Sequence, residues 1–412
     1  MRSLVVLGAG TAGTIITNKL HRRLPPDWRI LVVDPSETHI YQPGLLFLPF
    51  DDRAPSSLVR PTADQLPEGV ERIIAQVERV DTEARRVELT GGVTVPYDQL
   101  VIATGTAPRP DQTPGLTGEG WRDTAHEFYT LEGAVALREA LATFQGGRLV
   151  VHVSEMPIKC PVAPLEFAFL ADAHLASRGI RDRVELTYVT PLSDAFTKPQ
   201  AAAQLGRMLH DRHIGLEPDF MVERVEDQTL ISYDERRIPF DLLVTVPVNM
   251  GAEFVGRSGL GDELDHVRVD PGTFLTAGHD DIFAVGDAAA LPVSKAGSVA
   301  HFAADVFVDN FLRHIAGLPM ERSFDGHANC FVESGRGNAL LIDFNYDTEP
   351  LPGRYPVPGI GPLRLLGESR LNHWAKRLFE PIYWHMLLPG RRLPVPSAMS
   401  MAGKVRPHER SR

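Results

Sequence analysis

Short runs of apolar residues, each closed by a turn, recur along the chain and predict the strands of parallel sheets. The first β-turn-α-β unit has strands at residues 4–7 and 29–33, with a helix over residues 14–24 between them. Further apolar runs at residues 97–106 and 281–287 also predict strands. Continuous rather than alternating apolar positions are typical of parallel strands, because helices cover both faces of such sheets.

A second β-turn-α-β unit begins near residue 148. We expect a strand at 149–153, a loop at 154–164, a helix at 165–178, and strands at 184–189 and 241–247. The order predicts an α/β fold with two Rossmann-like dinucleotide-binding domains, the second inserted in the first. We assign residues 1–106 and 252–318 to the first domain, 107–251 to the second, and 319–412 to a C-terminal amphipathic segment.

The C-terminal segment has its own pattern. Apolar residues recur at steps of three and four between residues 371 and 387, which predicts a helix with one apolar stripe. Pro381 should kink this helix or divide it in two. Such a stripe ordinarily packs against the body of a protein, but a basic flank beside it favours contact with a membrane surface.

The uneven distribution of charged residues also favours contact with a membrane surface. Residues 353–412 hold eleven Lys or Arg and three Asp or Glu, whereas the whole chain of 412 residues has a net charge of −11. The acidic body argues against nucleic acid as a partner, and the basic segment favours an anionic surface. We therefore expect a protein that lies in the cytoplasm or peripherally on a membrane surface. The sequence leaves open whether it forms a homo-oligomer.

Other compositional features narrow the class. With 43% apolar and 23% charged residues, the chain has the composition of a folded protein. Met1 and Arg2 lead directly into the first strand, so we expect no secretory signal peptide. Cys160 and Cys330 are the only cysteines, which excludes a disulfide framework and leaves either inert thiols or a reactive pair. We assign no metal site.

The first turn carries a dinucleotide-binding pattern. Gly8, Gly10 and Gly13 have GxGxxG spacing between a strand and a helix, with Thr11 and Ala12 inside the turn. The glycines permit a tight turn, close approach of a pyrophosphate, and packing of helix on strand. Asp34 ends the second strand, where a carboxylate accepts hydrogen bonds from a ribose.

The corresponding loop of the second unit has lost its glycines. It contains Pro157, Pro161 and Pro164, and proline has no N–H to offer a phosphate. The next strand ends at Val189-Thr190-Pro191, without an acid for a ribose. We therefore expect that the second unit binds no nicotinamide nucleotide and presents Cys160 at the cofactor site instead.

Two later turns carry a resemblance. Ala103-Thr104-Gly105 and Gly286-Asp287 are similar to the turns that return to FAD in the pyridine nucleotide-disulfide oxidoreductase superfamily. The resemblance implies FAD as cofactor, with Asp287 on its ribityl chain. The segment 39–44 lacks the cysteine that tethers FAD in flavocytochrome c sulfide dehydrogenase, so non-covalent binding is implied. Further cofactor residues assigned with it are Gln42, Val77, Thr104, Gly105, Gly286, Lys295 and Gly297.

A narrower resemblance rests on the segments around the two cysteines. Pro157-Ile-Lys-Cys160-Pro-Val-Ala-Pro164, Ala328-Asn-Cys330-Phe331, Lys295-Ala-Gly-Ser-Val-Ala-His301 and His373-Trp-Ala-Lys376-Arg-Leu-Phe379 resemble the sulfide:quinone oxidoreductase family. In that family two cysteines face each other across the flavin, sulfide attacks their bridge, and the flavin reduces a quinone. The resemblance implies Cys160 and Cys330 as the redox pair and Phe331, Lys376 and Phe379 as quinone contacts.

Residue chemistry adds two expectations and one departure. Cys160 precedes a predicted helix start and follows Lys159, which favours a thiolate of lowered pKa. Glu166, in the first helical turn, either handles a proton or only complements the helix dipole. Tyr129 stands where many quinone-reducing members have a third cysteine, which leaves the exit of the sulfur product open.

The leading hypothesis is thus an FAD-dependent enzyme that oxidises sulfide and reduces a quinone. One alternative is an NAD(P)H-dependent flavin reductase that passes electrons to a quinone, and the proline-rich loop argues against it. A third hypothesis is a flavoprotein that carries sulfur without turnover.

Overall fold

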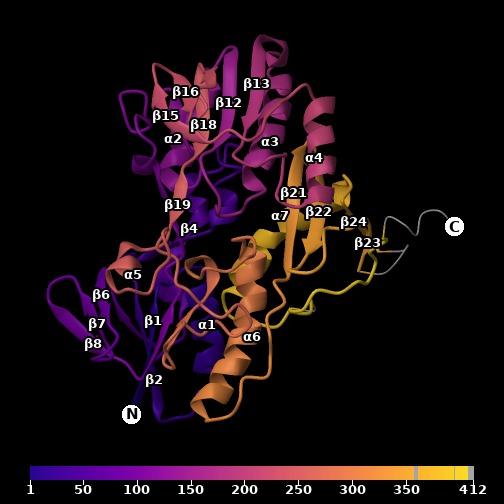
Figure 1. The fold of residues 1–412 in the computed structure, drawn as a ribbon. Coiled ribbons are helices and arrows are strands. Elements are labelled where there is room, and N and C mark those ends of the chain that lie inside the picture. Colours follow the sequence, from indigo (N-terminus) through magenta and orange to yellow (C-terminus); the bar gives the residue numbers. More distant parts are fainter. Residues whose placement is uncertain (357–360, 394, 407–412) are drawn as a thin grey trace.

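Two five-stranded parallel sheets, one above the other in Figure 1, form the body of the protein. The computed structural model describes residues 1–356, 361–393 and 395–406. Residues 357–360, 394 and 407–412 of the predicted C-terminal segment lie outside the described residues. The predicted α/β fold class is confirmed, with a Rossmann-like sheet in each half.

The first sheet joins the start of the chain to a strand from its second half. Its strand order is β20-β9-β1-β2-β5, and every pairing is parallel. Helices α1 (Thr11–His21) and α6 (Gly297–Ile315) pack side by side along it. The strands are β1 (Arg2–Leu7), β2 (Trp28–Val33), β5 (Glu71–Ile73), β9 (Gln99–Ile102) and β20 (Ile282–Ala284). A three-stranded antiparallel sheet flanks it, formed by β6 (Val77–Asp81), β7 (Arg86–Leu89) and β8 (Val93–Pro96).

The second sheet repeats this architecture with strand order β11-β18-β12-β13-β14, again all parallel. Its strands are β11 (Ala125–His126), β12 (Gly147–Val153), β13 (Val184–Val189), β14 (Gly215–Glu217) and β18 (Leu242–Val246). Its helices are α2 (Leu131–Thr143), α3 (Ala163–Ser177) and α4 (Pro199–Asp211). A small antiparallel sheet adds β15 (Val222–Glu226), β16 (Thr229–Ser232) and β17 (Arg237–Pro239).

The chain passes between the two units twice, and the two connecting segments pair with each other as β-strands. Strand β10 (Ala107–Arg109) lies antiparallel to β19 (Val248–Met250). Helix α5 (Glu253–Arg257) follows the second crossing, and a two-stranded sheet of β3 (Thr38–Ile40) and β4 (Val59–Pro61) lies beside the first unit. These crossings fall at the boundaries predicted for the inserted domain, and the division into domains remains our proposal.

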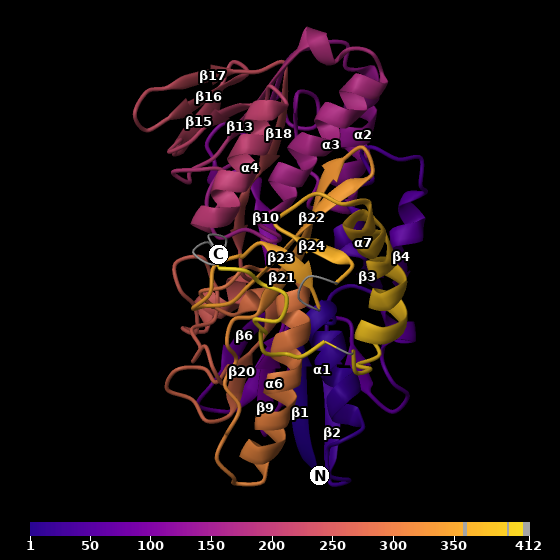
Figure 2. The ribbon, with the colours of Figure 1, turned by 90° about the vertical axis from the view of Figure 1, so that its right-hand side faces the viewer.

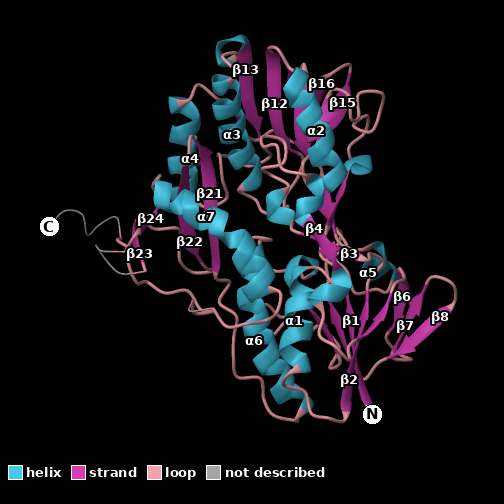
Figure 3. Ribbon diagram, turned by 180° about the vertical axis from the view of Figure 1, so that it is seen from behind, coloured by secondary structure: helices cyan, strands magenta, loops and turns pink. Residues whose placement is uncertain are grey.

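The C-terminal part forms a third sheet and a helix at the level between the two parallel sheets (Figures 2 and 3). The sheet has the order β21-β22-β24-β23, so β21 is an edge strand. Its strands are β21 (Ala328–Gly335), β22 (Asn338–Phe344), β23 (Gly353–Tyr355) and β24 (Leu363–Leu365). Helix α7 (Arg370–Ile382) packs on β21 and β22 and contains Pro381. It continues as a π-helical turn over Tyr383–Leu387, which is the division that Pro381 predicted.

One cluster of buried apolar side chains extends through both units and into the C-terminal segment, including Ile15, Phe167, Phe307 and Tyr383. The C-terminal segment is therefore part of the core and not an appendage. None of the described helices is both long enough and apolar enough to span a bilayer.

Candidate active site

A cavity lies where the carboxyl ends of the first sheet meet the 154–164 loop and α7. Its empty volume, counting its open mouth, is about 1200 Å³. The carboxyl ends of parallel strands are the usual place for a nucleotide ligand in such sheets. Fourteen of the predicted site residues line it: Gly10, Thr11, Ala12, Gln42, Thr104, Gly105, Cys160, Glu166, Gly286, Asp287, Lys295, Gly297, Lys376 and Phe379.

The three glycines of the first turn have different roles. A Cβ on Gly8 would lie 2.5 Å from the Ala103 carbonyl oxygen, and one on Gly13 would overlap the Gly8 carbonyl. These two glycines permit the close packing of turn, strand and helix. A Cβ on Gly10 would meet no atom within 4 Å, and Gly10 faces the cavity. Gly10 is therefore the position at which a ligand can approach the backbone.

The predicted ribose-binding acid lies at the same turn. Asp34 accepts hydrogen bonds from the N–H groups of Ala9, at 2.6 Å, and Ser36, at 2.7 Å. Other groups around the cavity also suit a polar cofactor. Thr104 and Thr106 line it, and their hydroxyls are buried without a hydrogen-bond partner among the described residues. Buried hydroxyls usually find a partner, so these positions fit FAD.

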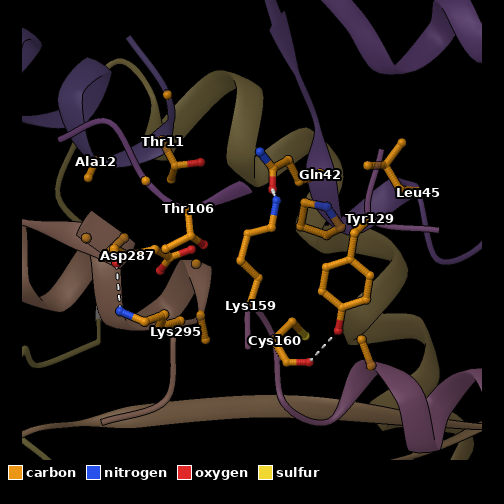
Figure 4. Close-up of a pocket in the computed structure, with 18 of the residues that line it drawn as sticks. Thr11, Ala12, Gln42, Leu45, Thr106, Tyr129, Lys159, Cys160, Asp287 and Lys295 are labelled. Atoms are coloured by element: carbon orange, nitrogen blue, oxygen red, sulfur yellow. Dashed lines mark hydrogen bonds between the residues drawn. The ribbon is translucent and has the colours of Figure 1, made fainter. Parts of the chain in front are cut away.

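Two lysines lie among the residues that line the cavity, Lys159 near Gln42 and Lys295 beside Asp287 (Figure 4). Lys295 Nζ donates to the carbonyl oxygens of Asp287, at 2.7 Å, and Ala289, at 3.1 Å. Lys159 Nζ donates to Gln42 Oε1 at 3.2 Å. Burial lowers the pKa of both lysines, and burial raises the pKa of Asp287 while the two lysines oppose that rise. The site thus places two cations beside one buried carboxyl.

Cys160 is held in a left-handed backbone conformation, with φ of +47°. Its N–H donates to the Lys295 carbonyl at 2.6 Å, and its carbonyl accepts from the N–H of Ala163 at 2.8 Å. Tyr129 also donates to that carbonyl, at 3.5 Å. Such a conformation is unfavourable for a residue with a Cβ, and these hydrogen bonds hold it.

The expected lowering of the Cys160 pKa is wrong. Burial raises the pKa of the Cys160 thiol to about 12, and the negative charge of Glu166 adds to the rise. Lys376 opposes it but is the smaller effect. The helix dipole that motivated the expectation is outweighed, because burial penalises the thiolate throughout the site.

Cys330 comes from strand β21 and lies within electrostatic reach of Cys160. Burial raises its pKa, and the charge of Cys160 is the next largest cause. Both cysteines are half-buried and neither is in a disulfide. The fold therefore brings together the only two thiols of the chain, from segments 170 residues apart.

Glu166 and Lys376 form a buried ion pair beside the cysteines. Lys376 Nζ bonds Glu166 Oε1 and also donates to the Phe331 carbonyl at 2.9 Å. Glu166 accepts the Glu333 N–H at 2.5 Å. The pair therefore satisfies backbone groups on the open edge of β21. Burial raises the pKa of Glu166, and Lys376 opposes that rise.

Some predicted residues lie outside the cavity lining. Gly8, Gly13 and Asp34 shape the first turn, and Cys330 and Phe331 lie in β21 behind Lys376. Val77 begins β6 and packs against the apolar cluster on the other face of the first sheet. The cavity is also lined by residues that the sequence did not single out, among them Leu45, Leu46, Phe128 and Tyr383.

Tyr383 is the missed residue with the most specific contacts. Its hydroxyl lies 2.8 Å from Thr11 Oγ1 and 2.6 Å from His39 Nε2, and His39 Nδ1 lies 3.0 Å from the Ala9 carbonyl. His39 Nδ1 therefore carries the proton, so Tyr383 donates to His39 and accepts from Thr11. The apolar stripe of the predicted helix placed Tyr383 on the apolar side of that helix, but it did not indicate that Tyr383 contacts the first glycine turn.

These features define a flavoprotein built from two dinucleotide-binding units, the second without a nucleotide cradle. The chain belongs to the pyridine nucleotide-disulphide oxidoreductase family, whose sequence profile matches residues 2–305. Its cofactor is FAD.

Comparison with individual proteins is more specific. The chain is 25% identical over 398 residues to the mitochondrial sulfide:quinone oxidoreductase of Dictyostelium discoideum, covering 94% of this chain and 86% of that protein. It is 24% identical over 361 residues to the sulfide-quinone reductase of Aquifex aeolicus, covering 81% of each. The crystal structure of the Aquifex aeolicus sulfide:quinone oxidoreductase superposes with a TM-score of 0.80 at 22% identity, covering 95% of this chain and 92% of that one.

Two glycine substitutions separate cofactor binding from folding. Gly10→Ala should leave the unfolding temperature of the apoprotein unchanged, because its Cβ meets nothing, and weaken FAD binding at least about tenfold. Gly13→Ala should destabilise the apoprotein itself by about 1–3 kcal/mol. Thermal unfolding of apoprotein and flavin-fluorescence titration measure the two effects. Equal destabilisation of both apoproteins would contradict this assignment.

Substitutions in the buried ion pair should be strongly coupled. Lys376→Met leaves the carboxylate of Glu166 buried without its counter-charge and should lower the free energy of unfolding by about 3–5 kcal/mol. Adding Glu166→Gln should recover most of that loss. Denaturant unfolding of both variants measures the coupling, with Arg148→Met in the exposed Arg148–Asp241 pair as a control that should cost less than about 1 kcal/mol. Additive effects at Glu166 and Lys376 would show that the pair does not act as a unit.

Proposed function

We propose that this protein oxidises sulfide through Cys160 and Cys330 and transfers the electrons through FAD to a quinone. The observation that carries the proposal is that Cys160 lines the cofactor cavity and Cys330, on strand β21, lies within electrostatic reach of it. The similarity to sulfide:quinone oxidoreductases over nearly the whole chain supports it.

The proposed chemistry begins at the cysteine pair in its bridged form. Hydrosulfide attacks one sulfur of the Cys160–Cys330 bridge, an S–S bond forms to the incoming sulfur, and the bond between the cysteines breaks. One cysteine then bears a persulfide and the other leaves as a thiolate. When the thiolate and the persulfide join again in a sulfur bridge, they release one proton and two electrons, which FAD, when bound, would accept and pass to a quinone. Lys376, whose charge favours the thiolate form of Cys160, supports that leaving group.

Reduction by NADH is disfavoured by the backbone of the 154–164 loop. Three of its N–H groups are already used: Lys159 donates to Asn249 Oδ1 at 3.1 Å, and Cys160 and Ala163 donate to backbone carbonyls. Pro164 lies at the first turn of α3 and has no N–H. A pyrophosphate would thus lack the donors that a helix start normally offers.

We also propose that α7 contacts a membrane surface and admits the quinone there. Leu371, Trp374 and Leu378 are 55%, 62% and 59% exposed, a concentration of apolar side chains on one side of the helix. Arg370 and Arg377 are exposed on the same helix. Exposed apolar groups flanked by cations are typical of helices that lie in the lipid interface. Phe379, and Phe331 close behind Lys376, are the proposed contacts of the quinone ring.

Anaerobic spectra test the reductive chemistry. Sulfide should bleach the flavin band of the wild-type protein, and NADH at micromolar concentration should not. Cys160→Ser and Cys330→Ser should each retain FAD and abolish bleaching by sulfide, because neither can form the bridge. Rapid reduction by NADH, or undiminished sulfide turnover in either variant, would reject the proposal. Bleaching without reoxidation by any quinone would favour the sulfur-carrier hypothesis.

Vesicle binding tests the surface of α7. The protein should sediment with phosphatidylglycerol vesicles at low salt, and less at high salt. Trp374→Glu and Leu378→Glu should each weaken binding about tenfold, the effect of losing one buried apolar side chain. Tyr233→Glu, at a side chain 71% exposed on the second unit, is the matched control and should bind like wild type. Equal binding by all three variants would exclude α7 as the contact surface.

A further inference from the structure

A line of polar side chains lies between α7 and β21, next to the Glu166–Lys376 pair. His373 and Lys376 are three residues apart, which places them on one side of the helix. His373 Nδ1 lies 2.7 Å from Glu333 Oε1, and Lys376 Nζ lies 2.9 Å from the Phe331 carbonyl. Successive turns of α7 thus each make one polar contact with β21.

The line leads from solvent to the cavity. The side chain of His373 is 18% exposed, whereas those of Glu333 and Glu166 are 2% and 1% exposed. Lys376 and Glu166 line the cavity itself. The backbone N–H of Glu333 donates to Glu166 Oε1 at 2.5 Å, and the Glu333 carboxyl is close enough for its charge to raise the pKa of Glu166.

Each glutamate has a buried oxygen to spare. Oε2 of Glu166 and Oε2 of Glu333 accept no hydrogen bond from the described residues, although both are buried. Unpaired buried carboxylate oxygens are rare and call for an explanation. They are the atoms on which a proton can reside, whereas the bonded oxygens hold the carboxyl groups in place.

Quinone reduction creates a demand for protons at this place. Oxidation of hydrosulfide to zero-valent sulfur releases two electrons and one proton, and reduction of a quinone to a quinol consumes two electrons and two protons. Each turnover therefore takes one proton from solvent. Glu166 lies in the cavity wall and its side chain is only 1% exposed, so a proton that reaches it needs a path of exchangeable groups.

We propose that His373 and Glu333 form a proton relay that supplies this proton to Glu166 and, from there, to the quinone. His373 takes a proton from water at its exposed edge, Glu333 accepts it on its carboxylate, and Glu166 receives it on its own carboxylate and passes it to the quinone. Each group then returns to its starting state. The relay rests on the proposed function, because it serves the quinone half of that reaction.

The neighbouring charged groups do not offer the same path. Arg212 bonds the Ser334 carbonyl and pairs with Glu368 at 2.8 Å, beyond Glu333 on β21. An arginine does not release its proton in proteins, so this ion pair conducts none. His373 is the partly exposed group that touches Glu333.

Stopped-flow measurement of the two half-reactions tests the relay on the FAD-loaded protein. In Glu333→Gln and His373→Gln, sulfide should reduce the flavin at the wild-type rate, because that step needs no proton from this side. Reoxidation by decylubiquinone should slow about tenfold to a hundredfold and acquire a larger solvent isotope effect. His385→Gln, at an exposed histidine in the π-helical turn, is the matched control and should behave like wild type.

Chemical rescue distinguishes a proton relay from a structural contact. Imidazole added to His373→Gly should restore reoxidation in proportion to its concentration, and Glu333→Asp should retain more activity than Glu333→Gln. Reoxidation at the wild-type rate in both Gln variants would overturn the relay. So would a slow reoxidation that shows no isotope effect and no rescue by imidazole.

The half-reactions also keep the two proposals apart. If sulfide does not bleach the wild-type flavin, or no quinone reoxidises it, the proposed function fails and the relay with it. If wild type completes both half-reactions and the variants do too, the relay alone fails. Should Glu333→Gln not fold, the variants at the partly exposed His373 carry the test by themselves.

Discussion

The open edge of strand β21 is the constraint on which the site depends. An edge strand presents unpaired N–H and carbonyl groups, and leaving them buried without partners is costly. Here Lys376 from α7 binds the Phe331 carbonyl and Glu166 from α3 binds the Glu333 N–H. The hydroxyl of Ser298, on α6, donates a hydrogen bond to a third edge group of β21, the Asn329 carbonyl, at 2.7 Å. Three helices from three parts of the chain thus meet along one strand, and Cys330 lies on that strand.

A buried ion pair is seldom a source of net stability, because desolvation of two charges offsets their attraction. The Glu166–Lys376 pair matters for geometry. The Phe331 carbonyl on the edge of β21 needs a donor, which is Lys376, and the Glu333 N–H needs an acceptor, which is Glu166. The same two side chains line the cavity and set the charge around Cys160. Support of the fold and control of the thiol chemistry therefore rest on the same atoms, and neither can be altered alone.

How much the sequence could predict depends on the range of the interaction involved. Parallel strands and glycine turns depend on local sequence, so the apolar runs and the GxGxxG spacing identified them. The predicted ends of these elements differ from the observed ends by a few residues. The proline-rich loop was also interpretable, since a missing N–H is a property of one residue. The pKa of Cys160 was not, because the helix dipole is visible in sequence while burial by distant segments is not. Tyr383 was missed for the same reason: a stripe of apolar positions does not say which of them reach the first glycine turn.

The two faces of α7 explain how one short helix could serve both the proposed membrane contact and the cofactor site. Successive residues on a helix are about 100° apart, so Lys376 and Leu378 point in nearly opposite directions. Lys376 faces Glu166 in the cavity wall, and Leu378 is exposed with Trp374. A helix is about 10 Å wide, so a quinone that arrives at the exposed face has one helix diameter to cross. Just beyond α7, the Tyr383 hydroxyl bonds Thr11 in the turn that would hold the FAD phosphates. These contacts fix the end of α7 against the cofactor turn, so the helix that lines the cavity and the turn that would hold FAD are positioned together.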